Sequence, residues 1–208
     1  MYIELIDLLR CPRAHDESWL VAAFNRMDGR FIIEGKLGCP VCSASFPITN
    51  GVADLRDSRE APAGNAYTPS AEDDDDVALR VAAMLGLTRA GSAVVLARMP
   101  GSIAGLVAEM ASVRVVSTNS LSSVSEQENV AMIRSNDRLP FASGSIDAVM
   151  LGTTVSSDQA EEAVRILKTG GRLVVTADSP LRGNLKELAR DDRYIVAEST
   201  GPLLGLTR

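Results

Sequence analysis

The chain has 208 residues, enough for one large domain or for a medium-sized domain with a small one. Hydrophobic residues make up 46% of it and aromatic residues only 4%, so its core must be mainly aliphatic. A net charge of −6 argues against broad binding to nucleic-acid backbones. No apolar run reaches the roughly 18 residues that span a bilayer, and the N-terminus lacks the layout of a secretory signal. We therefore expect a cytoplasmic protein that binds neither nucleic acid nor membrane directly.

The first 42 residues contain every cysteine and the single histidine of the chain. Cys11 and His15 form a Cys-x3-His pair, and Cys39 and Cys42 form a Cys-x2-Cys pair. Tetrahedral zinc takes four such ligands, commonly as two short-spaced pairs. A segment of about 50 residues also buries too little surface to be stable without a metal or disulfide. The pattern therefore predicts a structural zinc site.

The sequence between the two pairs is typical of a β-hairpin. WLVAAF at 19–24 and RFIIEG at 30–35 flank Asp28-Gly29, which is a strong signal for a tight turn. SASFPI at 43–48 is also typical of a strand. The first segment of the chain is therefore expected to be rich in β-structure.

Three other interpretations of the cysteines stay open. A disulfide between Cys39 and Cys42 would be unusual in a reducing cytosol. A redox Cys-x2-Cys normally opens a helix, whereas a strand-like segment follows here. A metal site that has lost its function is the third, because Ala14 stands where a second cysteine of the first pair would be usual.

Residues 1–56 resemble the small zinc-ribbon family that activates methyltransferases acting on tRNA, rRNA and release factors. The matching segments are LLRCP at 8–12 and LGCPVCSASFPITNGVADL at 37–55. In that family the ribbon docks on a methyltransferase domain and shields apolar surface. The resemblance therefore implies a protein partner, such as a methyltransferase or a component of translation, or a homo-oligomer.

A linker is expected at 57–75, where prolines, glycine and small residues leave little to bury. The four consecutive aspartates at 73–76 favour a helix start, because negative side chains are stabilised at the positive end of a helix dipole. A metal site or a site for a polybasic partner is the alternative interpretation of this acidic run.

Residues 76–208 are expected to form an α/β domain, because helical and strand patterns alternate along them. The expected fold is a Rossmann-like, mostly parallel sheet with helices on both faces, preceded by the small β-rich zinc-ribbon domain. Helices are expected over 78–85, 103–110, 160–167 and 181–190. The first is expected to end at Gly86 or Gly91, the second to have Ser102 as its N-cap, and the third to have Ser157 or Asp158 as its N-cap. Expected strands cover 93–97, 113–118, 130–134, 146–151, 172–177, 194–199 and 203–208, and 120–128 is expected to be a loop or a frayed helix.

Two segments of this domain resemble class I S-adenosylmethionine-dependent methyltransferases. RLPFASGSIDAVML at 138–151 is similar to their LPF.D.SFD.V segment, and EEAVRILKTGGRLVV at 161–175 to their E..RVLKPGG.L.. segment. The likeness covers about residues 76–199. It implies a methyltransferase-like fold fused to the type of ribbon that activates such enzymes.

The cofactor turn of that family is degraded in this chain. The family's first strand ends in an acidic residue followed by a glycine-rich turn that lets the backbone approach the ligand. Here the acidic position falls at Leu96, and the glycine positions fall at Arg98, Pro100 and Ser102. We expect residues 97–102 to fill the space of the cofactor's methionine part, with Met99 packed inside and Arg98 turned outward.

Few candidate cofactor contacts remain. Gly101 is the one early glycine of the turn. Thr118 and Asn119 follow the second strand but lack the charge of a carboxylate, and Asp137 or Asn136 is placed to reach an adenine amino group. We therefore predict cofactor contacts at Gly101, Asn119 and Asp137, and regard binding of S-adenosylmethionine as doubtful.

No catalytic residue is predicted. The loop GTTVSSD at 152–158 carries Thr153, Thr154 and Asp158, and is interpreted as a helix start. Methyl transfer can proceed by positioning alone, so a missing base does not exclude activity. Two functions stay open: a non-catalytic, methyltransferase-like binding or regulatory partner, and an active methyltransferase with an atypical cofactor loop. An oxidoreductase is disfavoured, because no G-x-G-x-x-G follows the first strand.

Overall fold

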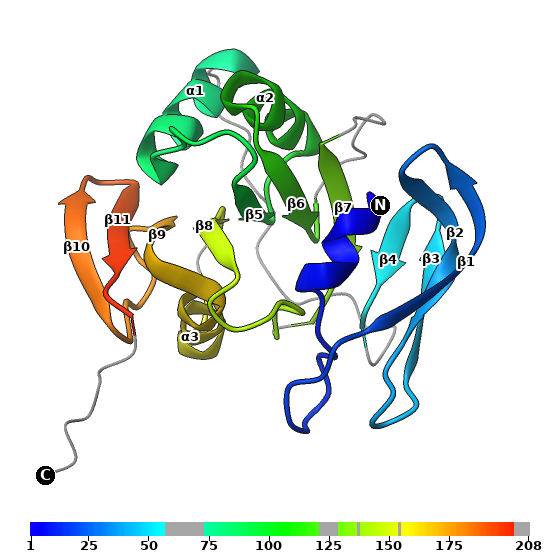
Figure 1. Ribbon diagram of the computed structural model, residues 1–208. Coiled ribbons are helices and arrows are strands. Elements are labelled where there is room, and N and C mark those ends of the chain that lie inside the picture. Colours follow the sequence, from blue (N-terminus) through cyan, green and yellow to red (C-terminus); the bar gives the residue numbers. More distant parts are fainter. Residues whose placement is uncertain (57–72, 121–128, 137, 154, 202–208) are drawn as a thin grey trace, which may run out of the picture.

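The computed structural model describes residues 1–56, 73–120, 129–136, 138–153 and 155–201. Its strands form one sheet with the order β1-β2-β3-β4-β7-β6-β5-β8-β9-β11-β10 (Figure 1). The elements are η1 (Ile3–Leu8), β1 (Val21–Asp28), β2 (Phe31–Gly38), β3 (Ser45–Thr49), β4 (Val52–Asp54), α1 (Asp74–Leu85), β5 (Ala93–Ala97), α2 (Gly101–Ala111), β6 (Arg114–Thr118), β7 (Val130–Arg134), β8 (Ile146–Leu151), α3 (Ser157–Ile166), β9 (Leu167–Thr176), β10 (Leu185–Arg190) and β11 (Tyr194–Ser199).

The sheet is mixed, with a parallel middle and antiparallel flanks. Strands β4, β7, β6, β5, β8 and β9 run parallel to their neighbours within this group. Strands β1 to β4 form an antiparallel meander on one side, and β9, β11 and β10 pair antiparallel on the other. The predicted α/β sheet is confirmed, and its parallel character is limited to the middle.

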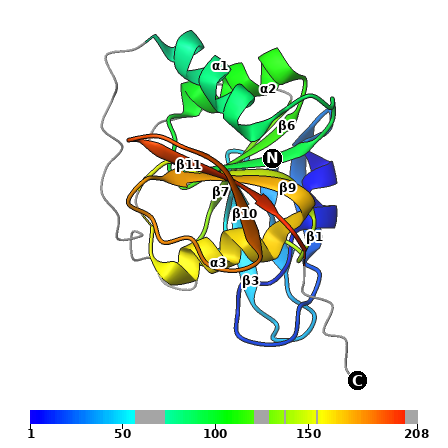
Figure 2. The same cartoon turned by 90° about the vertical axis from the view of Figure 1, so that its left-hand side faces the viewer.

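Helices cover both faces of the middle strands, with α1 and α2 on one face and α3 on the other (Figure 2). Every residue of β5 is buried, as expected for a parallel strand covered on both sides. Val94 and Leu96 belong to the cluster formed with α1 and α2, whereas Val95 belongs to the cluster formed with α3 and the N-terminal segment. The period-2 alternation of the strand thus divides the aliphatic core into two layers.

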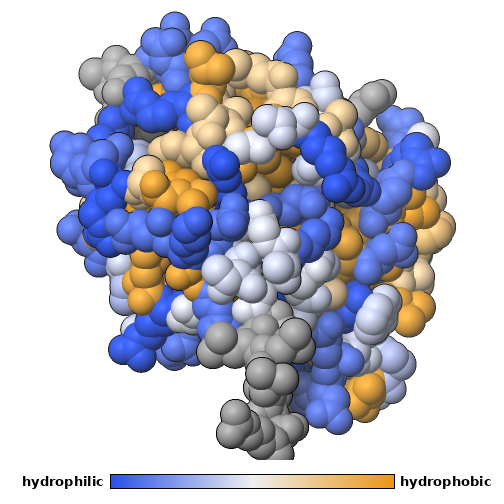
Figure 3. All heavy atoms as spheres, turned by 60° about the vertical axis from the view of Figure 1, so that its left-hand side comes forward, coloured by the Kyte–Doolittle hydropathy of each residue, from blue (hydrophilic) through white to orange (hydrophobic). Residues whose placement is uncertain are grey.

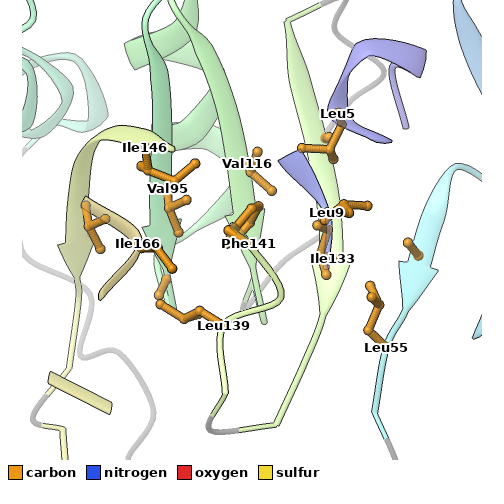
Figure 4. Close-up of a cluster of buried hydrophobic side chains, with 14 of the residues drawn as sticks. Leu5, Leu9, Leu55, Val95, Val116, Ile133, Leu139, Phe141, Ile146 and Ile166 are labelled. Atoms are coloured by element: carbon orange, nitrogen blue, oxygen red, sulfur yellow. The ribbon is translucent and has the colours of Figure 1, made fainter. Parts of the chain in front are cut away.

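The first 56 residues continue the sheet of the rest of the chain. Strand β4 pairs parallel with β7, and the amide of Leu55 donates to the carbonyl of Arg134 at 2.8 Å. Leu9 forms an antiparallel bridge with Phe141, which is fully buried. Figure 4 shows Leu5 and Leu9 in the same cluster as Phe141. A separate small domain is therefore not confirmed, and the linker prediction falls mostly on residues outside the described ranges.

The ends of the helices explain where they begin and stop. The side chain of Asp73 caps α1 by accepting from the amide of Asp75, and α1 ends at Gly86 in the left-handed conformation, as the sequence predicts. Ser156 caps α3 in a capping box with Gln159, so the predicted caps Ser157 and Asp158 are wrong by one or two residues.

Two further predicted boundaries need correction. Pro100 is the N-cap of α2, in place of Ser102, and it supplies no side-chain cap. Leu167, predicted as the last helical residue, already has extended backbone and begins β9. Leu167 pairs with Ile146 of β8, so strand pairing replaces the hydrogen bonds that a further helical turn would have made.

The predicted helix over 181–190 is wrong. Residues 185–190 form β10, which pairs antiparallel with β11 and lies at the edge of the sheet. The outer edge is lined by Lys186, Glu187 and Arg190, all exposed, and charged side chains on an edge strand discourage pairing with other chains. Figure 3 brings this side of the molecule forward and shows mostly hydrophilic side chains with separated apolar patches.

Other predictions fall outside the described residues: the final strand at 203–208 and most of the loop at 120–128. No helix within the described ranges is long and apolar enough to cross a membrane.

Candidate functional site

The four predicted metal ligands lie together. The ligand atoms of Cys11, His15, Cys39 and Cys42 are all within 4.8 Å of one another. The sulfur atoms of Cys11 and Cys42 are 3.8 Å apart, and Cys39 Sγ is 3.5 Å from His15 Nε2. Two thiolates on a tetrahedral zinc ion are about 3.8 Å apart, as follows from Zn–S bonds of about 2.3 Å. The cluster therefore has the donor set and the spacing to hold a metal ion.

The backbone around the cluster fixes two of the ligands. The Nδ1–H of His15 donates to the carbonyl of Asp16 at 2.6 Å, which leaves Nε2 directed at the sulfur atoms. The amide of Ser43 donates to the carbonyl of Cys39 at 3.0 Å, and Ser43 has a positive φ of 57° that closes this turn. Each pair thus lies in a local turn that brings its two ligands close together.

The thiols differ in acidity. Burial raises the pKa of Cys39, but hydrogen bonds from the amides of Cys42 and Val41 outweigh it and lower the pKa to about 6. Burial raises the pKa of Cys11 to about 12. The Cys39 thiolate is therefore favoured at neutral pH, whereas a metal ion is needed to keep Cys11 deprotonated.

The alternative interpretations of the cysteines fit the geometry less well. All three thiols are free, and a disulfide requires sulfur atoms about 2.05 Å apart. The Cys39–Cys42 turn leads into β3 and not into a helix, unlike a redox Cys-x2-Cys motif.

A second candidate site lies at the carboxyl ends of β5, β6 and β8. We name this hollow the sheet-end pocket; its cavity volume is about 30 Å³, which is room for a water molecule or two and far less than a drug-sized ligand needs. Strand β5 has β6 on one side and β8 on the other, and open α/β sheets bind ligands where the strand order reverses in this way. The pocket is lined by Ala97, Arg98, Thr118, Asn119, Asn136, Leu139, Leu151, Gly152, Thr153, Val155 and Gln159.

Two hydroxyl groups of the pocket lining have no hydrogen-bond partner among the described residues. Thr118 is 0% exposed and Thr153 is 7% exposed, and the Oγ1 atom of each is buried and unpaired. An unpaired buried polar group costs about 1–3 kcal/mol. A ligand or water with matching polar groups would recover this free energy.

The turn after β5 is only partly as predicted. Met99 is 1% exposed and packs in the cluster with α1 and α2, as expected. Ala97 and Arg98 line the sheet-end pocket, whose cavity of about 30 Å³ is too small for the methionine part of the cofactor, and the closed junction stays a prediction. Arg98 is half-buried in the pocket lining with a positive φ of 57°, a conformation that favours glycine.

The structure separates the three predicted cofactor residues. Gly101 begins α2, is buried and does not line the pocket. Asn119 lines the pocket, but its amide group donates to the carbonyl of Ser135 at 2.9 Å and its oxygen accepts from the amide of Ser135 at 3.1 Å. Asp137 lies outside the described residues. Gln159 lines the pocket and was not predicted, although the Ser156-x-x-Gln159 capping box was readable in the sequence.

The described residues of the pocket lining fit S-adenosylmethionine poorly. None of the lining residues within the described ranges has a carboxylate that could bond ribose hydroxyls. A glycine-rich turn is replaced by Arg98 and by Met99, whose side chain lies against Gly152. These features leave a small hollow whose described lining has no acidic group.

The sequence matches no known protein family, and no curated protein matches it either. The fold has many matches among solved structures. A geranyl diphosphate methyltransferase in complex with SAM is 17% identical with a TM-score of 0.42, covering 56% of this chain and 60% of that chain. A candidate S-adenosyl-L-methionine-dependent methyltransferase from Methanococcus maripaludis is 8% identical with a TM-score of 0.46, covering 64% of this chain and 87% of that one.

A further match is to a chain of the complex between the Haloferax volcanii Trm112 methyltransferase activator and a candidate methyltransferase. It is 16% identical with a TM-score of 0.34, and the match covers 52% of this chain and 61% of that chain. The matched region spans 60% of the geranyl diphosphate methyltransferase, so the chain corresponds to little more than half the length of that protein. The chain is similar to methyltransferase folds.

Proposed function

We propose that the chain is a non-catalytic, methyltransferase-like protein that acts as a binding or regulatory partner. The observation that carries this proposal is the turn after β5. Met99 packs into the core beside Gly152, and Arg98 stands in the pocket lining where the resembling enzymes have glycine. Steric bulk here opposes binding of the methionine part of S-adenosylmethionine.

The proposed metal is zinc, held by Cys11, His15, Cys39 and Cys42. Three sulfur donors and one imidazole, with tetrahedral spacing and no open position, favour a structural over a catalytic role. Bound zinc would cross-link the turn that carries Cys11 and His15 to the turn before β3, which carries Cys39 and Cys42. It would thereby hold together the two turns that carry the ligands.

The ribbon segment, residues 1–56, is proposed to pack against the rest of its own chain and not to dock on a separate protein. Its β4 strand already pairs with β7, and the amide of Arg10 donates to the carbonyl of Pro140 at 3.0 Å. These contacts use the backbone groups through which a strand would dock on another sheet. A methyltransferase, a component of translation or a second copy of the chain would then bind elsewhere on the surface.

The test is the affinity for S-adenosylmethionine, measured by calorimetry on the zinc-loaded full chain. We expect no binding at submillimolar concentrations. The same titration with Thr153→Val, which removes an unpaired pocket hydroxyl, distinguishes the pocket from other sites. Thr49→Val is the matched control, because Thr49 is exposed at the end of β3.

An active methyltransferase is the alternative function. The sheet-end pocket favours it, because an open hollow with two unpaired hydroxyls is present at the switch point of the sheet. Submillimolar binding of S-adenosylmethionine that is weakened by Thr153→Val, and not by Thr49→Val, would overturn the non-catalytic proposal.

A further inference from the structure

The first metal turn contacts, at three places, the chain segment that carries the pocket residue Leu139. We define the knuckle as residues 10–17, which include the ligands Cys11 and His15. We define the wall segment as residues 138–143, which include the pocket residue Leu139. The two segments are more than 120 residues apart in the sequence, and their contacts alternate with the metal ligands along the knuckle.

Backbone contacts form the first two connections. The amide of Arg10 donates to the carbonyl of Pro140 at 3.0 Å, one residue before Cys11. The guanidinium of Arg138 donates to the carbonyl of Arg13 at 2.9 Å, between Cys11 and His15. The path of the knuckle backbone therefore decides whether both bonds can form.

Glu17 makes the third connection, through its side chain. Its carboxylate accepts from the amide of Ser143 at 3.1 Å and from the hydroxyl of Ser143 at 2.8 Å. Arg165 of α3 lies 3.4 Å from the same carboxylate oxygen, and Arg10 Nε is 3.6 Å from the other. Glu17 thus joins the knuckle, the wall segment and α3 in one charged network.

Arg165 connects Glu17 to the pocket residue Leu139. It donates to the carbonyl of Leu139 at 2.8 Å and to the carbonyl of Phe141 at 2.9 Å. Glu162, which pairs with Arg165, accepts from the amide of Leu139 at 3.1 Å. The wall segment is therefore held from two sides, by α3 and by the knuckle.

We propose that metal binding at the cluster positions the wall of the sheet-end pocket, with Glu17 as the positioning residue. Cys11 and His15 hold the knuckle in place only when both bind the ion. Loss of the ion frees the backbone between them, and the three connections to the wall segment weaken together. The ribbon segment thereby makes ligand binding at the pocket dependent on the metal.

This inference rests on the proposed zinc centre. Because coupling between two sites is reciprocal, a change in the wall segment must alter zinc affinity. The experiment measures zinc affinity of the full chain by competition with a chromophoric chelator, in wild type, Glu17→Ala and Ser143→Ala. Ser92→Ala is the matched control, because the Ser92 hydroxyl donates to the carbonyl of Arg89 at 2.8 Å, a local bond that involves neither the knuckle nor the wall segment.

We expect Glu17→Ala to weaken zinc binding roughly tenfold, which corresponds to about 1.4 kcal/mol. Ser143→Ala should weaken it in the same direction by a smaller factor, and Ser92→Ala should leave it unchanged. Hydrogen exchange is the second measurement, on zinc-loaded protein. The Ser143 amide should exchange roughly tenfold faster in Glu17→Ala, for the same loss of about 1.4 kcal/mol.

Unchanged zinc affinity in both Glu17→Ala and Ser143→Ala would overturn the inference, as would an equal loss in Ser92→Ala. Wild-type protein that binds no zinc would instead contradict the proposed metal centre. The two failures are therefore distinguishable. Neither measurement depends on knowing the ligand of the pocket, and neither needs the zinc-free chain to stay folded.

Discussion

The side chain of Met99 occupies the space that a side chain at Gly152 would need. A Cβ on residue 152 would lie 3.0 Å from Met99 Cγ, closer still to its sulfur, and 2.9 Å from the carbonyl oxygen of Arg98. Glycine at the end of β8 and methionine after β5 are thus matched to each other. This packing sets the shape of the pocket entrance.

This contact predicts non-additive stabilities. Gly152→Ala should lower the free energy of unfolding by about 1–3 kcal/mol through overpacking, and Met99→Ala by about 2–5 kcal/mol through a cavity. In the double variant Gly152→Ala should cost less than in wild type, because the sulfur is gone, with a coupling of at least about 0.5 kcal/mol. Urea unfolding of the four proteins measures the cycle. Additive effects would show that the two side chains do not compete for this space.

The metal cluster was predictable from sequence because its signal is local. Two ligand pairs at short spacing around a hairpin restrict where the four side chains can go, and the structure brings all four together. The parallel strands of the middle were predictable for the same reason, since their continuous apolar runs indicate burial on both faces.

Long-range pairing was not predictable. Nothing in the sequence of β4 indicates that it pairs with β7, because hydrogen bonding between distant strands leaves no periodic pattern. The helix predicted at 181–190 failed for a related reason: Leu185 and Leu188 have spacing that suits a helix, but the open edge of β11 offers backbone hydrogen bonds to an extended chain. Helix propensity is a weak preference that such pairing overrides.

Zinc content is the most direct prediction for the ribbon segment. Protein purified without chelators should contain about one zinc equivalent, and Cys42→Ser should lose most of it because three ligands hold zinc less tightly. Val41→Ser is the control, because the Val41 side chain is exposed in the same turn and offers no metal ligand, while the substitution keeps the backbone amide that bonds to Cys39. Metal analysis of the three proteins, with hydrogen exchange, should show faster exchange in residues 1–56 of Cys42→Ser and continued protection around α1 and α2. Wild-type protein free of zinc would refute the centre.

The junction of β4 and β7 should have a pH-dependent component. Arg56 donates to Asp54 at 2.7 Å, and these hydrogen bonds hold the pKa of the Asp54 carboxyl below its usual value. A pKa lowered on folding stabilises the protein above the unfolded value of about 3.9, and this stabilisation is lost as the pH falls through the folded value.

Asp54→Asn should therefore lower the free energy of unfolding near neutral pH by about 0.5–1 kcal/mol, an amount limited by solvent screening. The difference from wild type should shrink as the pH falls below about 3.9. Glu187→Gln, which removes an exposed pair on β10, is the control and should have no measurable effect. A deficit of Asp54→Asn that persists unchanged at the lowest pH would exclude the ion pair as its cause.

The last prediction concerns the backbone conformation of Arg98. Its φ of 57° places a residue with a Cβ in the left-handed region, which costs about 1–2 kcal/mol. Its amide donates to the carbonyl of Thr118 at 2.9 Å, so the conformation is held by the neighbouring strand end and cannot relax freely. Arg98→Gly relieves the strain but gives the unfolded chain more freedom, so its stability should stay within about 1 kcal/mol of wild type. Arg98→Val should be less stable than Arg98→Gly by about 1–2 kcal/mol, because a β-branched side chain tolerates this region least. Equal stabilities of the two variants in urea unfolding would mean that the turn has another conformation in solution, and the steric argument against S-adenosylmethionine would then lose its basis.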